Sequence, residues 1–347
     1  MDKIAFPYRS STHLPFLHVV AESGGWEKHG LQVEYNKRIS SGNAHAGVMS
    51  GDVEFVGGNH ISPYGHRARG DRWVFLGQTV NYVPGRKLVV RADSGIEQIE
   101  DLREKVVGSR GNHPHYNDWL QLKQHGLDID RDEVSLIDQF QAAGGKKKLA
   151  EANAEGADAR ALANANPDAE ATTEPLWKWV LDKQIDAAFL QVPQCLFAEE
   201  AGLKVIDLEA FPMIYFTTIS TSLRFAEAHP DIVERFLKGL LEGIHFFKTQ
   251  PERSMKIIQD RYTLDGNMDL DMAKRTYASM AAALEPRMYP TTKAIENVYE
   301  ESLREDKDSV GINPMALWDL HYLRKIDDSG FIDKLYGGSP IAAAANS

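Results

Sequence analysis

The stretch Glu22–Glu34, with the sequence ESGGWEKHGLQVE, separates a helical pattern from a strand pattern. Before it, the apolar side chains of Leu14–Ser23 favour an amphipathic helix, and Lys3–Tyr8 is predicted to be a short strand. After it, Gln32–Lys37 is predicted to be a second strand. A strand, a helix, a glycine-containing turn and a second strand form a β-α unit, which is the building block of parallel sheets.

The same alternation of short apolar strands and helices continues to roughly residue 210, which predicts an α/β fold around a mostly parallel sheet. The predicted strands are Lys3–Tyr8, Gln32–Lys37, Glu54–Gly57, Trp73–Thr79, Arg86–Val90, Lys105–Gly108, Val134–Ile137, Ala187–Leu190, Lys204–Asp207 and Met213–Ser220. Further helices are expected at Ala44–Ser50 and Trp119–Gln124.

From Leu223 onward the pattern changes to helices alone. Ile232, Phe236, Leu240 and Ile244 recur at every fourth position, which predicts a helix with one buried face. We therefore expect a C-terminal helical array.

Two segments depart from this regular pattern. Residues 141–175 contain twelve alanines and no aromatic residue, and their larger apolar side chains are Leu149 and Leu162. Such a stretch cannot form a core of its own, so we expect a surface excursion or a mobile lid, with the tolerated surface insertion favoured. The alanine-rich tail Gly337–Ser347 is predicted to be disordered.

The composition excludes several classes of protein. The 347 residues are enough for two ordinary domains, and the net charge of −11 argues against nucleic acid or an anionic membrane as partner. No apolar run reaches the ~18 residues that a membrane helix requires, so no membrane insertion is expected. The single cysteine, Cys195, excludes an internal disulfide and cysteine-cluster metal sites, and we expect it to be packed rather than reactive. No cofactor is predicted.

The start of the chain bears on the compartment. Only Met1 and Asp2 precede the first predicted strand, and neither a charged nor an apolar leader segment is present. We expect a cytoplasmic protein if Met1 is the native start, and a periplasmic one if the chain is a trimmed mature form. An ABC permease would be a partner only in the exported case.

Several motifs occur in an order that carries information about the fold. They are Ser11–Phe16 (STHLPF), Glu22–Glu34, Ser50–Gly58 (SGDVEFVGG), Arg67–Gly70 (RARG), Val106–Ser109 (VVGS), Asp186–Phe189 (DAAF) and His229–Asp231 (HPD). Their order and spacing resemble the type 2 periplasmic binding proteins, the ABC-transporter substrate-binding proteins for sulfonates, taurine, nitrate and thiamine precursors. The resemblance extends to about residue 300 apart from residues 141–175, and Glu54 replaces the family's usual aspartate.

This resemblance implies a two-lobed fold with a ligand cleft between the lobes. The first lobe would be residues 1–83 plus 216–347, and the second residues 84–215. The chain would cross between them near Tyr82–Pro84 and Ile214–Phe216, with Pro84-Gly85 as the hinge.

In such folds a ligand binds beyond the carboxyl ends of the strands, where helix N-termini offer free N–H groups. The loops at these ends are predicted to be Arg9–His13, Ile39–Asn43, Gly58–His60 and Ser109–His115. The candidate ligand-binding residues in or beside them are Arg9, Ser11, Thr12, His13, Ser41, Asn59, His60, Tyr82, Arg110, Asn112, His113, His115 and Gln191. Arg9 and Arg110 offer guanidinium groups for a carboxylate, sulfonate or phosphate.

Four of the twelve histidines, His13, His60, His113 and His115, fall in these loops, which is more than chance would place there. A metal site made by His60, His113 and His115 is the one arrangement of this kind that the spacing offers. It lacks a carboxylate at a fixed spacing, so no metal site is predicted.

Two functions remain open. The favoured one is a substrate-binding protein for an anionic or aromatic small molecule; the alternative is a cytoplasmic decarboxylase, lyase or hydrolase with His60 and His113 as acid–base catalysts. The resemblance extends to thiamine-pyrimidine synthases, which share the opening His13–Phe16, and to aryl-sulfinate desulfinases. The desulfinase cysteine aligns with Ser11 or Thr12, and the synthase lysine is missing from Gly58–His60, so neither specific reaction is predicted.

Overall fold

The structure is a computed structural model that describes residues 1–9, 11–58, 60–83, 86–109, 112–138, 175–262 and 268–337, with the backbone alone at residues 11, 41, 112–115 and 138. The chain divides into two compact units, Met1–Val83 with Pro212–Ser347 and Pro84–Phe211. The predicted hinge Pro84-Gly85, the predicted excursion up to residue 174 and the tail after Gly337 lie outside the described residues.

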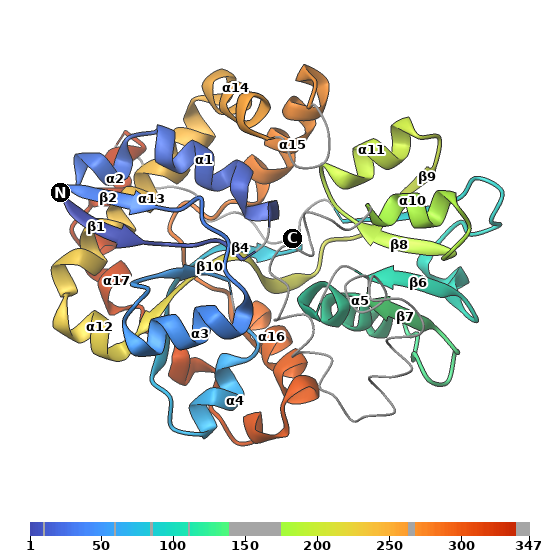
Figure 1. The fold of residues 1–347 in the computed structure, drawn as a ribbon, viewed down its shortest axis with the longest axis horizontal. Coiled ribbons are helices and arrows are strands. Elements are labelled where there is room, and N and C mark those ends of the chain that lie inside the picture. Colours follow the sequence, from blue (N-terminus) through green and yellow to red (C-terminus); the bar gives the residue numbers. More distant parts are fainter. Residues whose placement is uncertain are drawn as a thin grey trace. The chain divides into compact units, whose positions relative to one another are not determined.

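The first unit holds two small sheets and most of the helices (Figure 1). Its elements in chain order are β1 (Asp2–Ala5), η1 (Ser11–His13), α1 (Leu14–Glu22), α2 (Gly25–Lys28), β2 (Leu31–Glu34), α3 (Ser41–Ser50), β3 (Val56–Gly57), α4 (Pro63–Ala68), β4 (Trp73–Tyr82), β10 (Pro212–Ser222), α12 (Leu223–Ala228), α13 (Pro230–Thr249), α14 (Pro251–Arg261), α15 (Leu270–Ala283), α16 (Thr292–Glu305), η3 (Lys307–Ser309), η4 (Pro314–Leu317), α17 (His321–Asp328) and α18 (Phe331–Leu335).

The opening β-α unit is confirmed, because β1 and β2 pair in parallel with Asp2 opposite Leu31. The other sheet of this unit has the order β3-β10-β4 and is antiparallel throughout, so the expectation of a mostly parallel sheet is wrong here. The physical reason lies in the path of the chain. β4 ends and β10 begins at the boundaries with the second unit, so the two strands leave and return in opposite directions.

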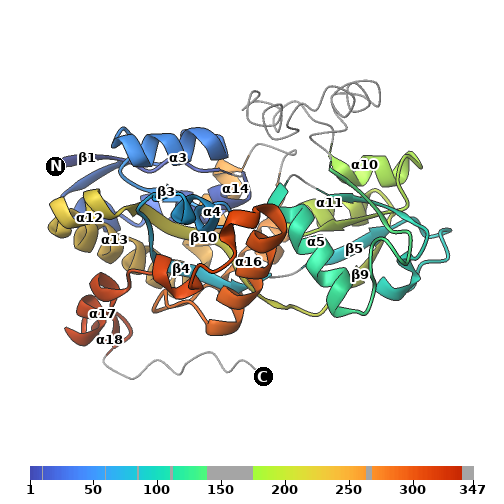
Figure 2. The ribbon, with the colours of Figure 1, turned by 90° about the horizontal axis from the view of Figure 1, so that it is seen from below.

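The predicted C-terminal helical array is present, and α13 is its central member. Phe236, Leu240 and Ile244 are fully buried, whereas Ile232 at the start of the stripe is only partly so. α13 packs closely against α1, because a Cβ on Gly243 would lie 2.7 Å from a methyl group of Val20. Figure 2 shows α16 beside β10, which it contacts.

The second unit is a single five-stranded sheet with helices. Its elements are β5 (Lys87–Val90), η2 (Ile99–Leu102), β6 (Val106–Ser109), α5 (Asn112–Gln124), β7 (Ser135–Asp138), α10 (Leu176–Leu181), β8 (Ala187–Leu190), α11 (Gln194–Glu200) and β9 (Lys204–Asp207). The strand order is β7-β6-β8-β5-β9, with β6 parallel to β7 and β8, and β5 antiparallel to β8 and β9. This sheet is therefore mixed rather than mostly parallel.

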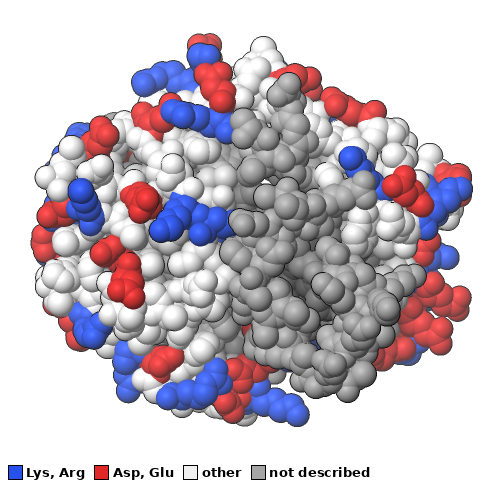
Figure 3. Space-filling model, in the orientation of Figure 1, with Lys and Arg blue, Asp and Glu red and all other residues white. Residues whose placement is uncertain are grey.

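Each predicted strand has a counterpart in the structure; β8 and β9 match their predicted bounds, and the ends of the others are shifted by up to a few residues. On the face shown in Figure 3, basic and acidic side chains are interspersed over the described surface. Among the described residues, no helix has the length and apolar character needed to span a membrane.

Candidate functional site

The site in the first unit is built around an irregular stretch of β10, Tyr215–Thr218. The pairing of β10 with β4 shifts register between Tyr215 and Thr218, and Phe216 has a φ of +64°, which is uncommon for a bulky residue. Gly58, in the loop after β3, has a φ of +89° and donates its N–H to the Thr218 carbonyl at 2.9 Å. Strained, bulged backbone of this kind is concentrated at functional sites.

A chain of buried polar side chains crosses this stretch and ends at His60. Gln78 of β4 donates from Nε2 to the carbonyls of Val80 and Tyr215, which leaves its Oε1 as an acceptor. The Thr218 hydroxyl donates to that Oε1 at 2.7 Å, and its oxygen lies 3.1 Å from His60 Nδ1. Since the only hydroxyl proton is used toward Gln78, Thr218 must accept from His60, and this assigns a proton to Nδ1. In the neutral ring, Nε2 is then the nitrogen that can accept a hydrogen bond.

His13 approaches the same stretch of β10 from the N-terminus of α1. Its side chain is buried, and its ring centroid lies 5.0 Å from that of Phe216. A Cβ on Gly58 would lie 3.3 Å from His13 Cε1, so the glycine loop and the imidazole are in close contact. His13 and His60 therefore both lie against residues 216–218. Thr12 precedes His13 and is half-buried, and the side chain of Ser11 lies outside the described part of the chain.

Two arginines lie where the parallel β1–β2 pair ends. An isolated bridge between Tyr8 and Arg38 extends the pairing beyond β1, with Tyr8 N–H bonded to the Lys37 carbonyl at 3.0 Å. Arg9 is the next residue, and burial of its guanidinium, followed by repulsion from the Arg38 charge, lowers the pKa of Arg9 to about 10. Arg9 is still protonated at neutral pH. The carboxyl ends of two neighbouring strands thus bring two cations together, and Arg38 was not among the predicted residues.

The loop after β2 leads directly into α3. Ser40 is the N-cap of this helix, and its hydroxyl accepts the Asn43 N–H at 3.3 Å, a common role of serine at this position. Ser41 is the first residue of the helix, where backbone N–H groups have no intrahelical acceptor. Asn59 lies outside the described residues. Tyr82, the last residue of β4, is half-buried, and desolvation, with the Glu285 charge second, raises the pKa of its hydroxyl.

In the second unit, the segment after β6 differs from the prediction. Asn112–Gln124 is helix α5, so Asn112, His113 and His115 belong to its first turn and not to a loop. The reason is that Pro114 occupies the first turn, where a missing N–H costs nothing. Arg110 and the side chains of residues 112–115 lie outside the described part of the chain.

Other polar residues of the second unit lie at or near the carboxyl ends of β6 and β8. Ser109, at the carboxyl end of β6, is fully buried, and Gln194 at the start of α11 is 6% exposed. Gln191 is half-buried, and its carbonyl accepts the N–H of Cys195, which is itself buried as expected for a packed cysteine. The carboxyl ends of the parallel strands β6 and β8 therefore carry polar residues in this unit too.

Sequence reasoning missed several residues that the structure brings into these sites. Gln78 and Thr218 sit inside predicted strands, and a buried ion pair joins Arg86 to Asp118 in the second unit. The sequence does point to Gln78 and Thr218. Both lie in pairs of polar residues, Gln78-Thr79 and Thr217-Thr218, within otherwise apolar strands. A polar side chain inside a buried strand is costly unless it is hydrogen-bonded, so such residues indicate a buried hydrogen-bond network.

The fold is that of the periplasmic binding proteins. The aliphatic sulfonate-binding protein SsuA of Escherichia coli aligns over 91% of this chain and 96% of its own with a TM-score of 0.64 and 13% identity. SsuA of Xanthomonas axonopodis pv. citri bound to MOPS aligns over 92% and 99% with a TM-score of 0.61 and 13% identity.

An enzyme has the same fold. A cysteine-to-serine variant of DszB in complex with biphenyl-2-sulfinic acid aligns over 94% of this chain and 99% of its own, with a TM-score of 0.62 and 16% identity. At these identities the likeness concerns the fold. The chain belongs to the NMT1/THI5-like family, whose profile matches residues 11–254. A search of curated proteins found no significant sequence match.

Proposed function

We propose that the protein binds a small organic anion, with the sulfonates and carboxylates as the ligand class. The observation that carries this proposal is the pair Arg9 and Arg38 at the carboxyl ends of β1 and β2. Two guanidinium groups close enough for one to lower the pKa of the other repel each other, and burial of Arg9 adds a desolvation cost. An anion bound beside them offsets both costs and accepts charge-assisted hydrogen bonds.

The adjoining elements favour the same ligand. The N-terminus of the ten-residue helix α3 follows β2 and supplies N–H groups together with the positive end of the helix dipole. The Ser40 hydroxyl accepts the Asn43 N–H there, which holds the N-terminal turn in place. The structural relatives that are named for sulfonate binding agree with this ligand class.

The two histidines complete the proposed site. His13 and His60 lie against the bulged stretch 216–218, and the Gln78–Thr218 chain fixes the orientation of the His60 ring. We assign His60 Nε2 to a polar group of the ligand. Arg110, Asn112, His113, His115 and Gln191 remain proposed ligand contacts of the second unit. If the protein is exported, an ABC permease is the proposed partner.

A second candidate function is an acid–base reaction on the bound anion, and the hydrogen-bond chain behind His60 favours it. An imidazole whose Nδ1 is held by a buried acceptor has a defined tautomer, which is what a general base or acid needs. DszB, an enzyme with the same fold, binds biphenyl-2-sulfinic acid in its cysteine-to-serine variant; in this chain the chemistry would be that of His60. Isothermal calorimetry with organic sulfonates and carboxylates tests binding, and NMR of the recovered ligand tests turnover.

A further inference from the structure

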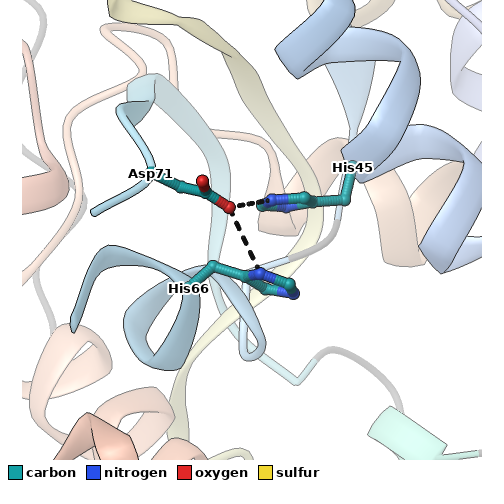
Figure 4. A group of neighbouring side chains, drawn as sticks. All are labelled: His45, His66 and Asp71. Atoms are coloured by element: carbon teal, nitrogen blue, oxygen red, sulfur yellow. Dashed lines mark hydrogen bonds and ion pairs between the residues drawn. The ribbon is translucent and has the colours of Figure 1, made fainter. Parts of the chain in front are cut away.

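Away from the proposed anion site, three metal-ligand side chains of the first unit converge (Figure 4). His45 comes from α3, His66 from α4, and Asp71 from the turn that joins α4 to β4. Both rings direct a nitrogen to the same carboxylate oxygen of Asp71, His45 Nε2 at 2.7 Å and His66 Nδ1 at 3.3 Å. All three ligand atoms lie within 4.8 Å of one another.

We propose that His45, His66 and Asp71 form a binding site for a divalent transition metal of the zinc class. Two imidazoles and one carboxylate are a ligand set that Zn²⁺ and its neighbours Co²⁺ and Ni²⁺ accept. Two ligands on one tetrahedral Zn²⁺ lie roughly 3.3 Å apart when each bond is about 2.0–2.1 Å. The separation of His66 Nδ1 from the Asp71 oxygen, 3.3 Å, matches that value, and that of His45 Nε2, 2.7 Å, is shorter.

The surroundings provide both rigidity and access. His45 is only 11% exposed and stacks flat on the fully buried Trp73, with ring centroids 5.2 Å apart and an interplanar angle of 5°. His66 and Asp71 are 34% and 37% exposed, so water can fill the remaining coordination positions. The two imidazole rings stack with their centroids 3.7 Å apart.

Two features limit the affinity. His45 Nδ1 is buried and has no hydrogen-bond partner among the described residues, so its ring is oriented by packing and not by the outer-shell hydrogen bond of strong sites. Arg69 brings positive charge near His66, although Asp306 and Asp308 both pair with it. Since a missing outer-shell partner costs about 10–100-fold in metal affinity, we expect a dissociation constant for Zn²⁺ in the micromolar range.

A metal bound at this site would stabilise α3 and α4, the two helices next to the proposed anion site. α3 carries the Ser40 cap at its N-terminus, and α4 begins three residues after His60. A metal that joins His45 to His66 and Asp71 would hold these two helices together. Its role is structural, and it does not depend on the proposed ligand.

The test is calorimetric titration of the untagged full chain with Zn²⁺. The variants H45A, H66Q and D71N should each bind at least 100-fold more weakly, because each loses a direct ligand. H125A is the matched control, since His125 makes a single contact of the same kind, with Glu100 at 3.0 Å, and should bind like the wild type. Equal affinity of the wild type and all three ligand variants, or no wild-type binding at up to 1 mM Zn²⁺ (roughly a thousand times the expected constant), would overturn the proposal.

A second readout locates the ion. Trp73 lies on His45, so paramagnetic Co²⁺ or Ni²⁺ should quench its fluorescence, and W73F should bind the metal while losing most of the quenching. Circular dichroism of each variant establishes that the fold is retained. Quenching that is the same in W73F and in the wild type would place the metal elsewhere in the chain.

Discussion

His60 donates its Nδ1–H to the hydroxyl of Thr218 across 3.1 Å, and both side chains are buried in the first unit. The direction of this bond follows from Gln78, which accepts the Thr218 proton at 2.7 Å. Three side chains, on the loop after β3, on β10 and on β4, thus determine which nitrogen of the His60 imidazole carries the proton.

The first prediction concerns Thr218→Val, which keeps the shape of the side chain and removes the hydroxyl. It leaves a buried amide oxygen and a buried imidazole N–H without their partner, so the free energy of unfolding should fall by about 1–3 kcal/mol. Urea denaturation measures this. Thr217→Val is the matched control, because the Thr217 hydroxyl is equally buried and has no partner among the described residues. Equal losses in the two variants would contradict the hydrogen-bond chain.

A second prediction uses the pH dependence of anion binding. The pKa of Arg9 is lowered to about 10, so its guanidinium is charged below that value and neutral above it. The affinity for a sulfonate should therefore be constant between about pH 7 and 9 and should fall above about pH 10. Calorimetry at pH 8 and 10.5 gives the comparison, with circular dichroism to establish folding. Arg9→Gln should bind weakly and lack this decrease; an unchanged decrease in that variant would assign the titration to another group.

A third prediction concerns acid stability of the second unit. The Arg131 side chain, with the Asp128 N–H second, lowers the pKa of Asp132 to about 2. Because the folded pKa is depressed, the Asp132 carboxylate stabilises the fold above about pH 4, and this contribution is lost as the pH falls toward 2. Asp132→Asn should be less stable than the wild type at pH 6, and the difference should vanish near pH 2. Urea denaturation at the two pH values measures this, and a stability difference at pH 2 as large as that at pH 6 would contradict the prediction.

The fourth prediction separates binding from catalysis at His60. If the protein only binds its ligand, His60→Ala should weaken affinity by about 1–3 kcal/mol, the cost of losing a buried hydrogen-bond partner. If His60 is an acid–base catalyst, the same change should lower turnover ~100-fold or more while binding is largely kept. Calorimetry and NMR detection of product distinguish the two. A variant that matches the wild type in both measurements would remove His60 from the site.

Much of the fold could be predicted because local periodicity determines it. Strands such as Ala187–Leu190 match their predicted bounds, and the β-α unit at Glu22–Glu34 forms as expected. Strand direction could not be predicted in this way. β4 and β10 are antiparallel because of where the chain crosses between units, which no local pattern reveals.

The site was less accessible to sequence reasoning for three reasons. Which polar residues of β10 face His60 depends on the register shifts around Phe216, and a one-residue shift turns a side chain to the other face. The cluster of His45, His66 and Asp71 has no motif spacing and is assembled only by the packing of α3 on the turn before β4. The helix start at Asn112 was missed because Pro114 was taken as a loop residue.

The central claim is that Arg9 binds an organic anion, and one titration tests it most directly. Calorimetry with a set of alkane sulfonates and carboxylates is carried out on the wild type, on Arg9→Ala and on Arg324→Ala, whose guanidinium is 78% exposed on α17. We predict that at least one anion binds the wild type and Arg324→Ala with equal affinity, and that Arg9→Ala binds it at least ~10-fold more weakly, as expected for a lost charged hydrogen bond. Binding to Arg9→Ala that equals the wild type, or no binding of any anion to the wild type, would contradict the account.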